Sequence, residues 1–224
     1  MSAEALAGLV GELPGDLRGR ALTHSSWTGE APDSYERLAY LGDSVLALAV
    51  AAAIYERFPE IDAGGLTRIH NHTVSGVSCA EIGRELGVPA MLEAAQPEAE
   101  DAIPASILLA GSRPLPEVTE ALIGACFVAF GFERTAAAVA EAFAAEIEYA
   151  VEAPPDAKSA LQELLARRRA RVTYAVTGES GPAHERTFEV EATVDGERVG
   201  TGAGRSKKAA EQMAAEEALK QLGH

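Results

Sequence analysis

The sequence predicts a two-domain protein, with an all-α first domain and a smaller α+β second domain. Apolar residues recur at helical spacing through residues 1–152, and no segment there keeps the every-second-residue alternation of a strand. Residues 153–156, Ala-Pro-Pro-Asp, form a break that is typical of a stiff linker. Beyond the linker, residues 157–224 predict the element order α-β-β-β-α.

The predicted helices of the first domain are separated by glycine, proline and clusters of small polar residues. They are expected at residues 3–13, 17–26, 35–58, 66–86, 117–131 and 135–151. Residues 97–116 contain four prolines, which predicts a loop with one short helix at residues 105–110. Every element expected in this domain is therefore helical.

Cysteine and histidine side chains are candidates for chemistry, but their patterns favour structural roles. Cys79 and Cys126 fall within apolar helical patterns and form no paired metal-ligand motif, so we expect buried or half-buried free thiols. His70 and His72 lie two residues apart on an expected helix, where their side chains point in different directions. His24 stands alone near the end of a helix and is interpreted as a packing or capping residue.

The second domain is expected to form a helix, three strands and a last helix, at residues 158–169, 172–176, 188–194, 197–201 and 206–222. Asp195-Gly196 is a dipeptide favoured in two-residue hairpin turns, so it predicts the turn between the second and third strands. Ser206 is placed to cap the last helix.

Charge is distributed unevenly along the chain. The net charge of −15 by itself argues against a nucleic-acid partner. Residues 1–150 hold 8 arginines, no lysine and 22 acidic residues, a net charge of −14. Residues 151–224 hold 11 basic and 12 acidic residues, a net charge of −1. The basic residues are therefore concentrated in the last third, where clustering on one face would permit nucleic-acid binding.

Two pairs of carboxylates lead into apolar helices. Glu36 and Asp43 lie two helical turns apart and share a face, and Asp43 falls in an apolar run where a carboxylate requires a partner or a metal ion. Glu117 and Glu120 share a face at the start of another apolar helix. Two such helices together could hold a hard divalent cation such as magnesium. The alternative is that each acid is solvated and favours the helix dipole.

These stretches resemble the ribonuclease III family. Tyr-Glu-Arg-Leu-Ala-Tyr-Leu-Gly-Asp-Ser-Val-Leu, at residues 35–46, is similar to the signature helix of that family. Thr-Glu-Ala-Leu-Ile-Gly-Ala at 119–125 is similar to its second acidic helix, and Leu-Thr-His-Ser-Ser at 22–26 also matches. The C-terminal part resembles the double-stranded-RNA-binding domain that usually follows in bacterial members, so the resemblance covers nearly the whole chain.

The resemblance implies an endoribonuclease that cleaves double-stranded RNA by metal-assisted hydrolysis, leaving 5′-phosphate and 3′-hydroxyl ends, and that acts in rRNA and mRNA processing. It implies a homodimer through the first domain and Mg²⁺ as the metal, with Mn²⁺ as a substitute. Asp43 and Glu120 would be catalytic residues and metal ligands, Glu117 a further ligand, and Glu36 a structural or supporting residue. Neither end of the chain has a long apolar span, so we expect a cytoplasmic protein and no membrane.

In the second domain the resemblance assigns RNA contacts to three regions. These are Gln162 and Glu163 on the first helix, His184 in the loop at residues 181–184, and Ser206, Lys207 and Lys208 at the start of the last helix. Ammonium groups and the positive end of a helix dipole can face phosphates together. Contacts of this kind recognise the shape and 2′-hydroxyls of A-form RNA. For the lysine pair alone, a solvated helix face is the alternative.

The chain departs from the family pattern at three positions. Ala39 stands where the family usually has a glutamate that binds magnesium, and Gly65 replaces the glutamate of a Gly-Glu-Leu segment. Glu117 stands where aspartate is usual and is one methylene longer. A catalytically impaired or inactive RNA-binding homodimer is therefore the alternative function. An acidic interaction protein unrelated to RNA would leave the C-terminal lysine, loop-histidine and glycine pattern unexplained.

Overall fold

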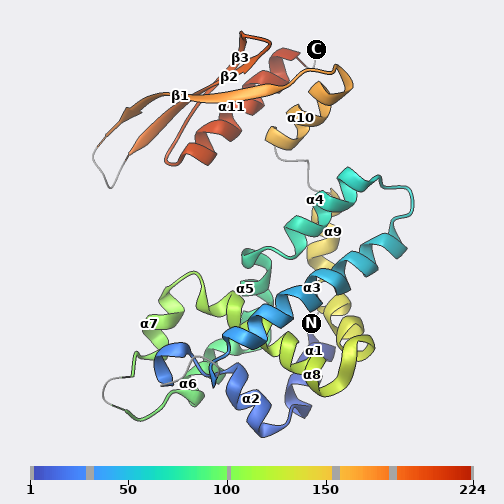
Figure 1. Ribbon diagram of the computed structural model, residues 1–224, viewed down its shortest axis with the longest axis vertical. Coiled ribbons are helices and arrows are strands. Elements are labelled where there is room, and N and C mark those ends of the chain that lie inside the picture. Colours follow the sequence, from blue (N-terminus) through green and yellow to red (C-terminus); the bar gives the residue numbers. More distant parts are fainter. Residues whose placement is uncertain (1–2, 29–32, 100–101, 153–156, 182–185, 223–224) are drawn as a thin grey trace. The chain divides into compact units, whose positions relative to one another are not determined.

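Figure 1 shows the computed structural model of the chain, which describes residues 3–28, 33–99, 102–152, 157–181 and 186–222. The chain divides into two units, Met1–Ala153 and Pro154–His224. Within the described residues, the first unit contains only helices, and the second contains three strands and two helices. The fold class expected from the sequence is therefore confirmed.

The helices of the first unit follow one another through short connections. They are α1 (Glu4–Glu12), α2 (Gly15–Ala21), the 3-10 helix η1 (Ser25–Trp27), α3 (Glu36–Arg57), α4 (Ala63–Thr73), α5 (Gly76–Glu85), α6 (Val88–Ala95), α7 (Ala105–Ala110), α8 (Pro114–Ala142) and α9 (Ala144–Glu152). The predicted helices at residues 3–13, 35–58 and 105–110 correspond to α1, α3 and α7. No element was predicted at α6.

The long helices α3 and α8 pack against each other at the centre of this unit. Their buried side chains, such as Leu46 and Leu122, belong to one apolar core. The backbones approach closely where glycines face them: a Cβ at Gly42 would overlap the carbonyl oxygen of Glu120, and a Cβ at Gly124 would overlap that of Leu38. Glycine at both positions is therefore required for this crossing.

By length and composition alone, α3 and α8 could each cross a membrane. In this fold both helices contribute buried residues to the same core, and each carries a carboxylate within its length, Asp43 on α3 and Glu120 on α8. Core helices of globular domains are apolar for the same reason as membrane spans, because they are largely surrounded by other apolar residues. We therefore interpret both as core helices.

One helix of the first unit ends earlier than the apolar pattern predicts. The helix expected at residues 17–26 stops at Ala21. His24 has an extended backbone, and its Nδ1 accepts a hydrogen bond from the Ser26 N–H (3.0 Å) at the start of η1. The interpretation of His24 as a capping residue is confirmed, whereas the longer helix was wrong.

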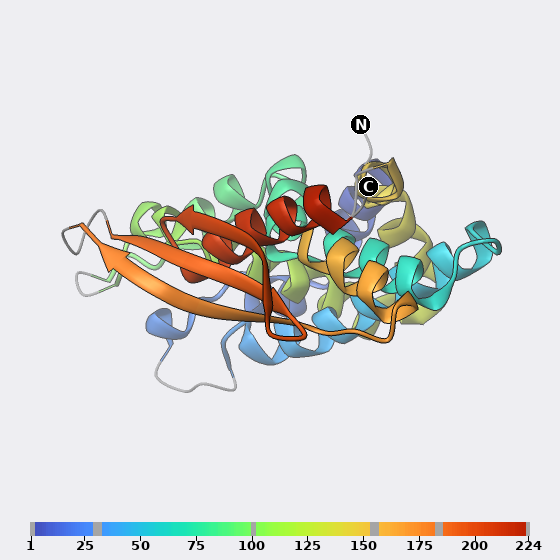
Figure 2. The same cartoon turned by 90° about the horizontal axis from the view of Figure 1, so that it is seen from above.

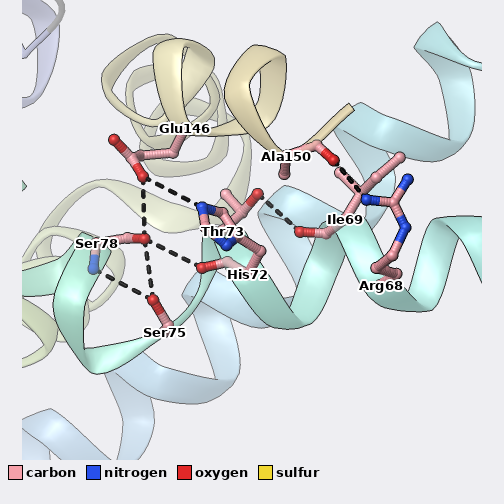
Figure 3. A network of polar contacts seen from close by, with 8 residues as sticks. All are labelled: Arg68, Ile69, His72, Thr73, Ser75, Ser78, Glu146 and Ala150. Atoms are coloured by element: carbon pink, nitrogen blue, oxygen red, sulfur yellow. Dashed lines mark hydrogen bonds and ion pairs between the residues drawn. The ribbon is translucent and has the colours of Figure 1, made fainter. Parts of the chain in front are cut away.

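The helix expected at residues 66–86 is two helices, α4 and α5. Ser75 lies between them with an extended backbone, and its Oγ accepts a hydrogen bond from the Ser78 N–H (3.3 Å), which caps α5. The Ser78 hydroxyl in turn donates to Glu146 Oε2 of α9 (3.1 Å) (Figure 3). His72 Nε2 of α4 lies 3.9 Å from the same carboxylate oxygen. This network, which the helical periodicity does not reveal, joins α4, α5 and α9.

The other singled-out histidines and cysteines have structural environments. His70 Nε2 lies 3.0 Å from the carbonyl oxygen of Ala47 on α3, whereas His72 points to α9, so the two rings serve different contacts. Cys79 and Cys126 are fully buried free thiols, as expected. Burial raises the pKa of each thiol to about 12.

The helix α8 joins two segments that were predicted as separate helices. The first, expected at residues 117–131, begins earlier, at Pro114, and bends at Gly131, where φ is 79°. The second, expected at 135–151, was wrong as a single helix: it is divided at Phe143 between α8 and α9. Gly131 supports the bend because its positive φ has no side-chain penalty.

The second unit contains α10 (Ala157–Arg167), β1 (Val172–Ser180), β2 (Thr187–Val194), β3 (Glu197–Gly204) and α11 (Lys207–Leu222). The strands form an antiparallel sheet in the order β1-β2-β3. Both helices pack on one face of the sheet around a shared core (Figures 1 and 2). Asp195 and Gly196 have positive φ of 53° and 86°, which confirms the predicted two-residue turn.

Small residues let β3 and α11 pack closely. Gly200, Gly202 and Gly204 alternate along the face of β3 that meets the helix. A Cβ at Gly202 would overlap backbone atoms of Ala210 and Ala214. The glycine pattern of the C-terminal segment is therefore a packing requirement of this sheet–helix contact.

We predict that Gly124→Ala destabilises the protein because the added methyl group would overlap the backbone of α3. The expected loss in the free energy of unfolding is about 3 kcal/mol, at the upper end of core overpacking. Gly8→Ala, on the exposed face of α1 with open space around it, should instead add about 0.5–1 kcal/mol. Urea denaturation of both variants checks this, and a Gly124→Ala variant as stable as wild type would contradict the required crossing.

Candidate active site and nucleic-acid interface

A hollow of about 810 Å³ lies where α3, α8 and the chain before each of them meet. The four carboxylates singled out in the sequence all line it: Glu36, Asp43, Glu117 and Glu120. The structure thus brings the two acidic pairs, which are far apart in the sequence, to one place. The close crossing at Gly42 and Gly124 causes this, because it brings the start of α8 against the first turns of α3.

Asp43 is exposed, although its apolar sequence neighbours predicted a buried carboxylate. The apolar run around it implied a buried carboxylate, but Gly42 is the residue pressed against α8, and Asp43 faces the hollow. Among the described residues, no hydrogen bond or ion pair engages its carboxylate. Asp43 is therefore available to a ligand.

Glu120 is half-buried beside the other acids. Burial raises the pKa of Glu120 to about 7, and the negative charges of Asp43 and Glu117 add to the shift. Near neutral pH this carboxyl group is therefore close to its point of half-ionisation. A cation placed among the three carboxylates would favour the ionised form.

Glu117 is held at both carboxylate oxygens. The Tyr35 hydroxyl donates to Oε2 (2.9 Å), and Arg113 Nε lies 3.3 Å from Oε1. Tyr35 is buried, and burial together with its hydrogen bond to Glu117 raises the pKa of the phenol, so it remains a donor. Neither partner of Glu117 was predicted from the sequence. The spacing of Arg113 and Glu117 could have indicated an i,i+4 ion pair, but no local pattern links Tyr35 to a residue on α8.

The unusual positions Ala39 and Gly65 differ in location. Ala39 is buried and lines the hollow, so it faces the space shared by the acidic side chains. Gly65 lies in the first turn of α4, where its N–H donates to Asp62 Oδ1 (2.8 Å), away from the residues that line the hollow. Of the two positions, only Ala39 therefore alters the lining of the acidic hollow.

Most of the predicted RNA contacts are exposed on the helices of the second unit. Gln162 and Glu163 are exposed on α10. Ser206 Oγ accepts a hydrogen bond from the Ala209 N–H (3.1 Å), which confirms it as the cap of α11. Lys207 and Lys208 are exposed in the first turn of that helix. His184 lies outside the described residues.

Comparison with known proteins accounts for both units. Residues 15–147 match the family described as Ribonuclease-III-like, and residues 157–222 match the double-stranded RNA binding motif. "Ribonuclease 3" of Thermobifida fusca is 37% identical over 217 residues, which cover 94% of this chain and 88% of that protein. This chain belongs to the ribonuclease III family.

Further ribonuclease III proteins agree with the assignment. "Ribonuclease 3" of Streptomyces coelicolor is 38% identical over 97% of this chain and 79% of that protein. The crystal structure of the nuclease domain of ribonuclease III from Campylobacter jejuni is 26% identical, with a TM-score of 0.50, and the match covers 67% of this chain and 97% of that one. The resemblance recognised from the sequence motifs is confirmed.

The acidic hollow between α3 and α8 fits a divalent cation that uses few protein ligands. Within the described part of the chain, no group of three or more His, Cys, Asp or Glu side chains is arranged to hold a metal ion. Magnesium, however, binds through one or two carboxylates together with water and substrate phosphates. Asp43, whose carboxylate is free, and Glu120, whose ionisation the other acids oppose, provide two such carboxylates.

We predict that the metal-free protein loses stability as the pH rises through about 7. The pKa of Glu120 is raised from 4.5 in the unfolded chain to about 7 in the folded protein, so the folded state binds more protons between these values. The stabilisation is complete below pH 4.5 and is lost as Glu120 ionises.

Thermal unfolding in EDTA between about pH 5.5 and 8 measures how much the ionisation of Glu120 lowers the stability of the folded protein. The fall in melting temperature should be smaller in Glu120→Gln, which cannot ionise, and addition of Mg²⁺ should reduce it in the wild type. An equal pH dependence in the two proteins would show that Glu120 ionises in its ordinary range.

Proposed function

We propose that this protein is an endoribonuclease that hydrolyses double-stranded RNA at the hollow between α3 and α8, leaving 5′-phosphate and 3′-hydroxyl ends. The observation that carries the proposal is the meeting of Asp43, Glu117 and Glu120 in one hollow. Membership of the ribonuclease III family, together with a double-stranded-RNA-binding domain, supports both the reaction and the substrate class.

Three carboxylates have separate parts in this proposal. Asp43 and Glu120 would hold the metal ion, with Glu117 as a supporting ligand. A bound Mg²⁺ would lower the pKa of a water nucleophile and offset negative charge on the reacting phosphate, and Mn²⁺ would substitute. Tyr35 and Arg113 fix the orientation of Glu117, whose longer side chain has more rotamers than the aspartate usual in the family. Glu36, exposed at the rim, would have a structural or supporting role.

The second unit would bind the RNA duplex. Gln162 and Glu163, exposed on α10, would contact ribose hydroxyls, and Ser206, Lys207 and Lys208 at the start of α11 would contact phosphates. His184 belongs to the same proposed interface through its loop. Since the first unit is strongly acidic, the affinity for RNA would depend on this basic helix end rather than on the net charge.

An apolar face of α3 supports a homodimer through the nuclease domain. Tyr40, Leu48 and Tyr55 are 81%, 57% and 75% exposed, and their spacings of about two turns place them on one side of the helix. Exposed large apolar side chains grouped in this way are typical of interaction sites. Tyr40 also lines the acidic hollow, so a second subunit on this face would lie beside the proposed active site.

Family membership supports a proposal for the cellular role. We propose a cytoplasmic enzyme that acts on rRNA and mRNA precursors, because those transcripts contain the duplex segments that the two domains would recognise. A role without a membrane agrees with α3 and α8 serving as core helices.

A double-stranded-RNA-binding homodimer with impaired or no catalysis is the second candidate function. The observation in its favour is Ala39, which leaves the wall of the hollow without the glutamate that the family usually has there. Displacement of a reacting group by about 1 Å can cost a hundredfold in rate, so the missing ligand is significant. Activity measurements in Mg²⁺ and in Mn²⁺ separate the two candidates.

Cleavage of a long RNA duplex tests the assignment of Glu120. We expect Glu120→Gln to abolish cleavage while binding of the duplex, measured in EDTA, stays as in wild type. The matched control is Glu133→Gln, the same substitution at an exposed position further along α8. Cleavage by Glu120→Gln at the wild-type rate would refute its assignment as a catalytic residue.

Restoring an acid at position 39 tests the second candidate. We expect the wild type to cleave, and Ala39→Glu to raise the rate at limiting Mg²⁺ by about tenfold, since loss of a single group around a metal site commonly costs at least that factor in metal affinity or activity. Ala39→Gln has nearly the same volume without the charge and should give no gain. A wild type that binds duplex but does not cleave it in either metal would favour the binding protein.

A further inference from the structure

A second hollow, of about 520 Å³, lies at the end of α10 where the chain enters β1. Its lining includes Gln162, one of the proposed RNA contacts, and two arginines that none of the proposed functions uses, Arg169 and Arg171. Leu165 and Val172 provide apolar parts of its surface. Gln162, on α10, and Arg169, two residues beyond the end of that helix, both line this hollow.

The backbone at Arg169 is unusual for its residue type. Its φ is 56°, in the left-handed region that favours glycine. The Arg169 N–H donates to the Ala166 carbonyl (3.1 Å) and the Ala170 N–H to the Leu165 carbonyl (3.0 Å), which is the Schellman ending of a helix. Glycine is the usual residue at that position. An arginine therefore occupies this position at a cost in backbone free energy.

The charges of this hollow are not compensated locally. Arg169 and Arg171 are exposed, and neither forms an ion pair with any residue in the described part of the chain. No carboxylate lines the hollow. Arg168, in the same run, differs because its guanidinium donates to the Leu222 carbonyl (3.0 Å) and so fastens α10 to the end of α11.

We propose that Arg169 and Arg171 bind phosphates of the RNA duplex whose ribose hydroxyls Gln162 contacts, which would add a fourth contact region to the three predicted from the sequence. The inference rests on the proposed function, since it takes Gln162 as an RNA contact. Phosphates border the minor groove in which ribose hydroxyls lie. Guanidinium groups that share a hollow with Gln162 would therefore contact the RNA phosphates beside the same groove. Guanidinium groups suit this role because they pair with phosphate oxygens in a bidentate manner.

The two arginines would also help a domain of nearly zero net charge to bind RNA. The second domain has a net charge close to zero, so its affinity for RNA must come from basic side chains without acidic partners. The lysines of α11 supply one such group, and the arginines at the end of α10 supply another. A duplex held at both would be positioned along α10 rather than at one end of the domain.

Binding of the full-length chain to an RNA duplex of about 20 base pairs tests the proposal, because one such domain spans about 16 base pairs. Fluorescence anisotropy is measured in EDTA over roughly 50–200 mM KCl. The test variant is Arg169→Gly with Arg171→Gln, in which glycine relieves the left-handed backbone, so the melting temperature should not fall because of that change. The control is Arg198→Gln, an exposed arginine on β3 that is paired with Glu191.

We expect the double variant to bind about tenfold more weakly near 0.1 M salt and to reduce the slope of log K against log salt by about two, one for each lost phosphate contact. Arg198→Gln should change neither quantity. A double variant with wild-type affinity and slope would overturn the inference. An equal loss on single-stranded RNA of the same length would also overturn it, because the site would then not lie at a duplex groove.

The same measurements separate this inference from the proposed function. If Lys207→Gln with Lys208→Gln weakens binding and the arginine variant does not, the proposed function stands and the inference falls. If the wild-type protein does not bind duplex RNA, the proposed RNA interface fails and the inference falls with it.

Discussion

The close crossing of α3 and α8 depends on two glycines that leave no side chain between the helix backbones. Gly42 faces the Glu120 carbonyl and Gly124 faces the Leu38 carbonyl, so each helix fits into the other. Asp43 follows directly after one contact, and Glu120 lies at the other side of it. A larger residue at either glycine would widen the crossing and separate the carboxylates. Packing of the core, rather than attraction between the functional groups, therefore assembles the site.

This assembly works against electrostatics. Asp43, Glu117 and Glu120 have the same charge, and their proximity is one reason why the pKa of Glu120 rises to about 7. The apolar core beneath them supplies the free energy that holds like charges together. Tyr35 and Arg113 offset part of the repulsion at Glu117 only. The remaining repulsion between the carboxylates favours binding of a divalent cation, and a metal-dependent nuclease requires such a cation at its active site.

In the RNA-binding domain, glycines again permit close backbone contact, here between a strand and a helix. Glycines of β3 lie against alanines of α11, so the helix approaches the sheet closely with a small core. That contact leaves the long polar side chains of both helices on the outside. Lysines at the start of α11 and arginines after α10 are consequently exposed to solvent, although the whole chain is acidic. Nucleic-acid binding here depends on where the cations are placed.

The sequence by itself determined the two-domain architecture, the family, the long helices and the four acids, because periodicity and ordered motifs are local properties. It could not show that Ser75 and His24 cap the starts of new helices, since similar residues also occur within helices. It also placed Asp43 in a buried position, because an apolar run does not reveal which neighbour faces the partner helix. Only the tertiary structure decided that Ala39 lines the hollow with the acids, that Tyr35 holds Glu117 and that Arg169 lines the same hollow as Gln162. These contacts join residues on different elements or in an unusual backbone conformation, and such geometry exists only after the elements have packed.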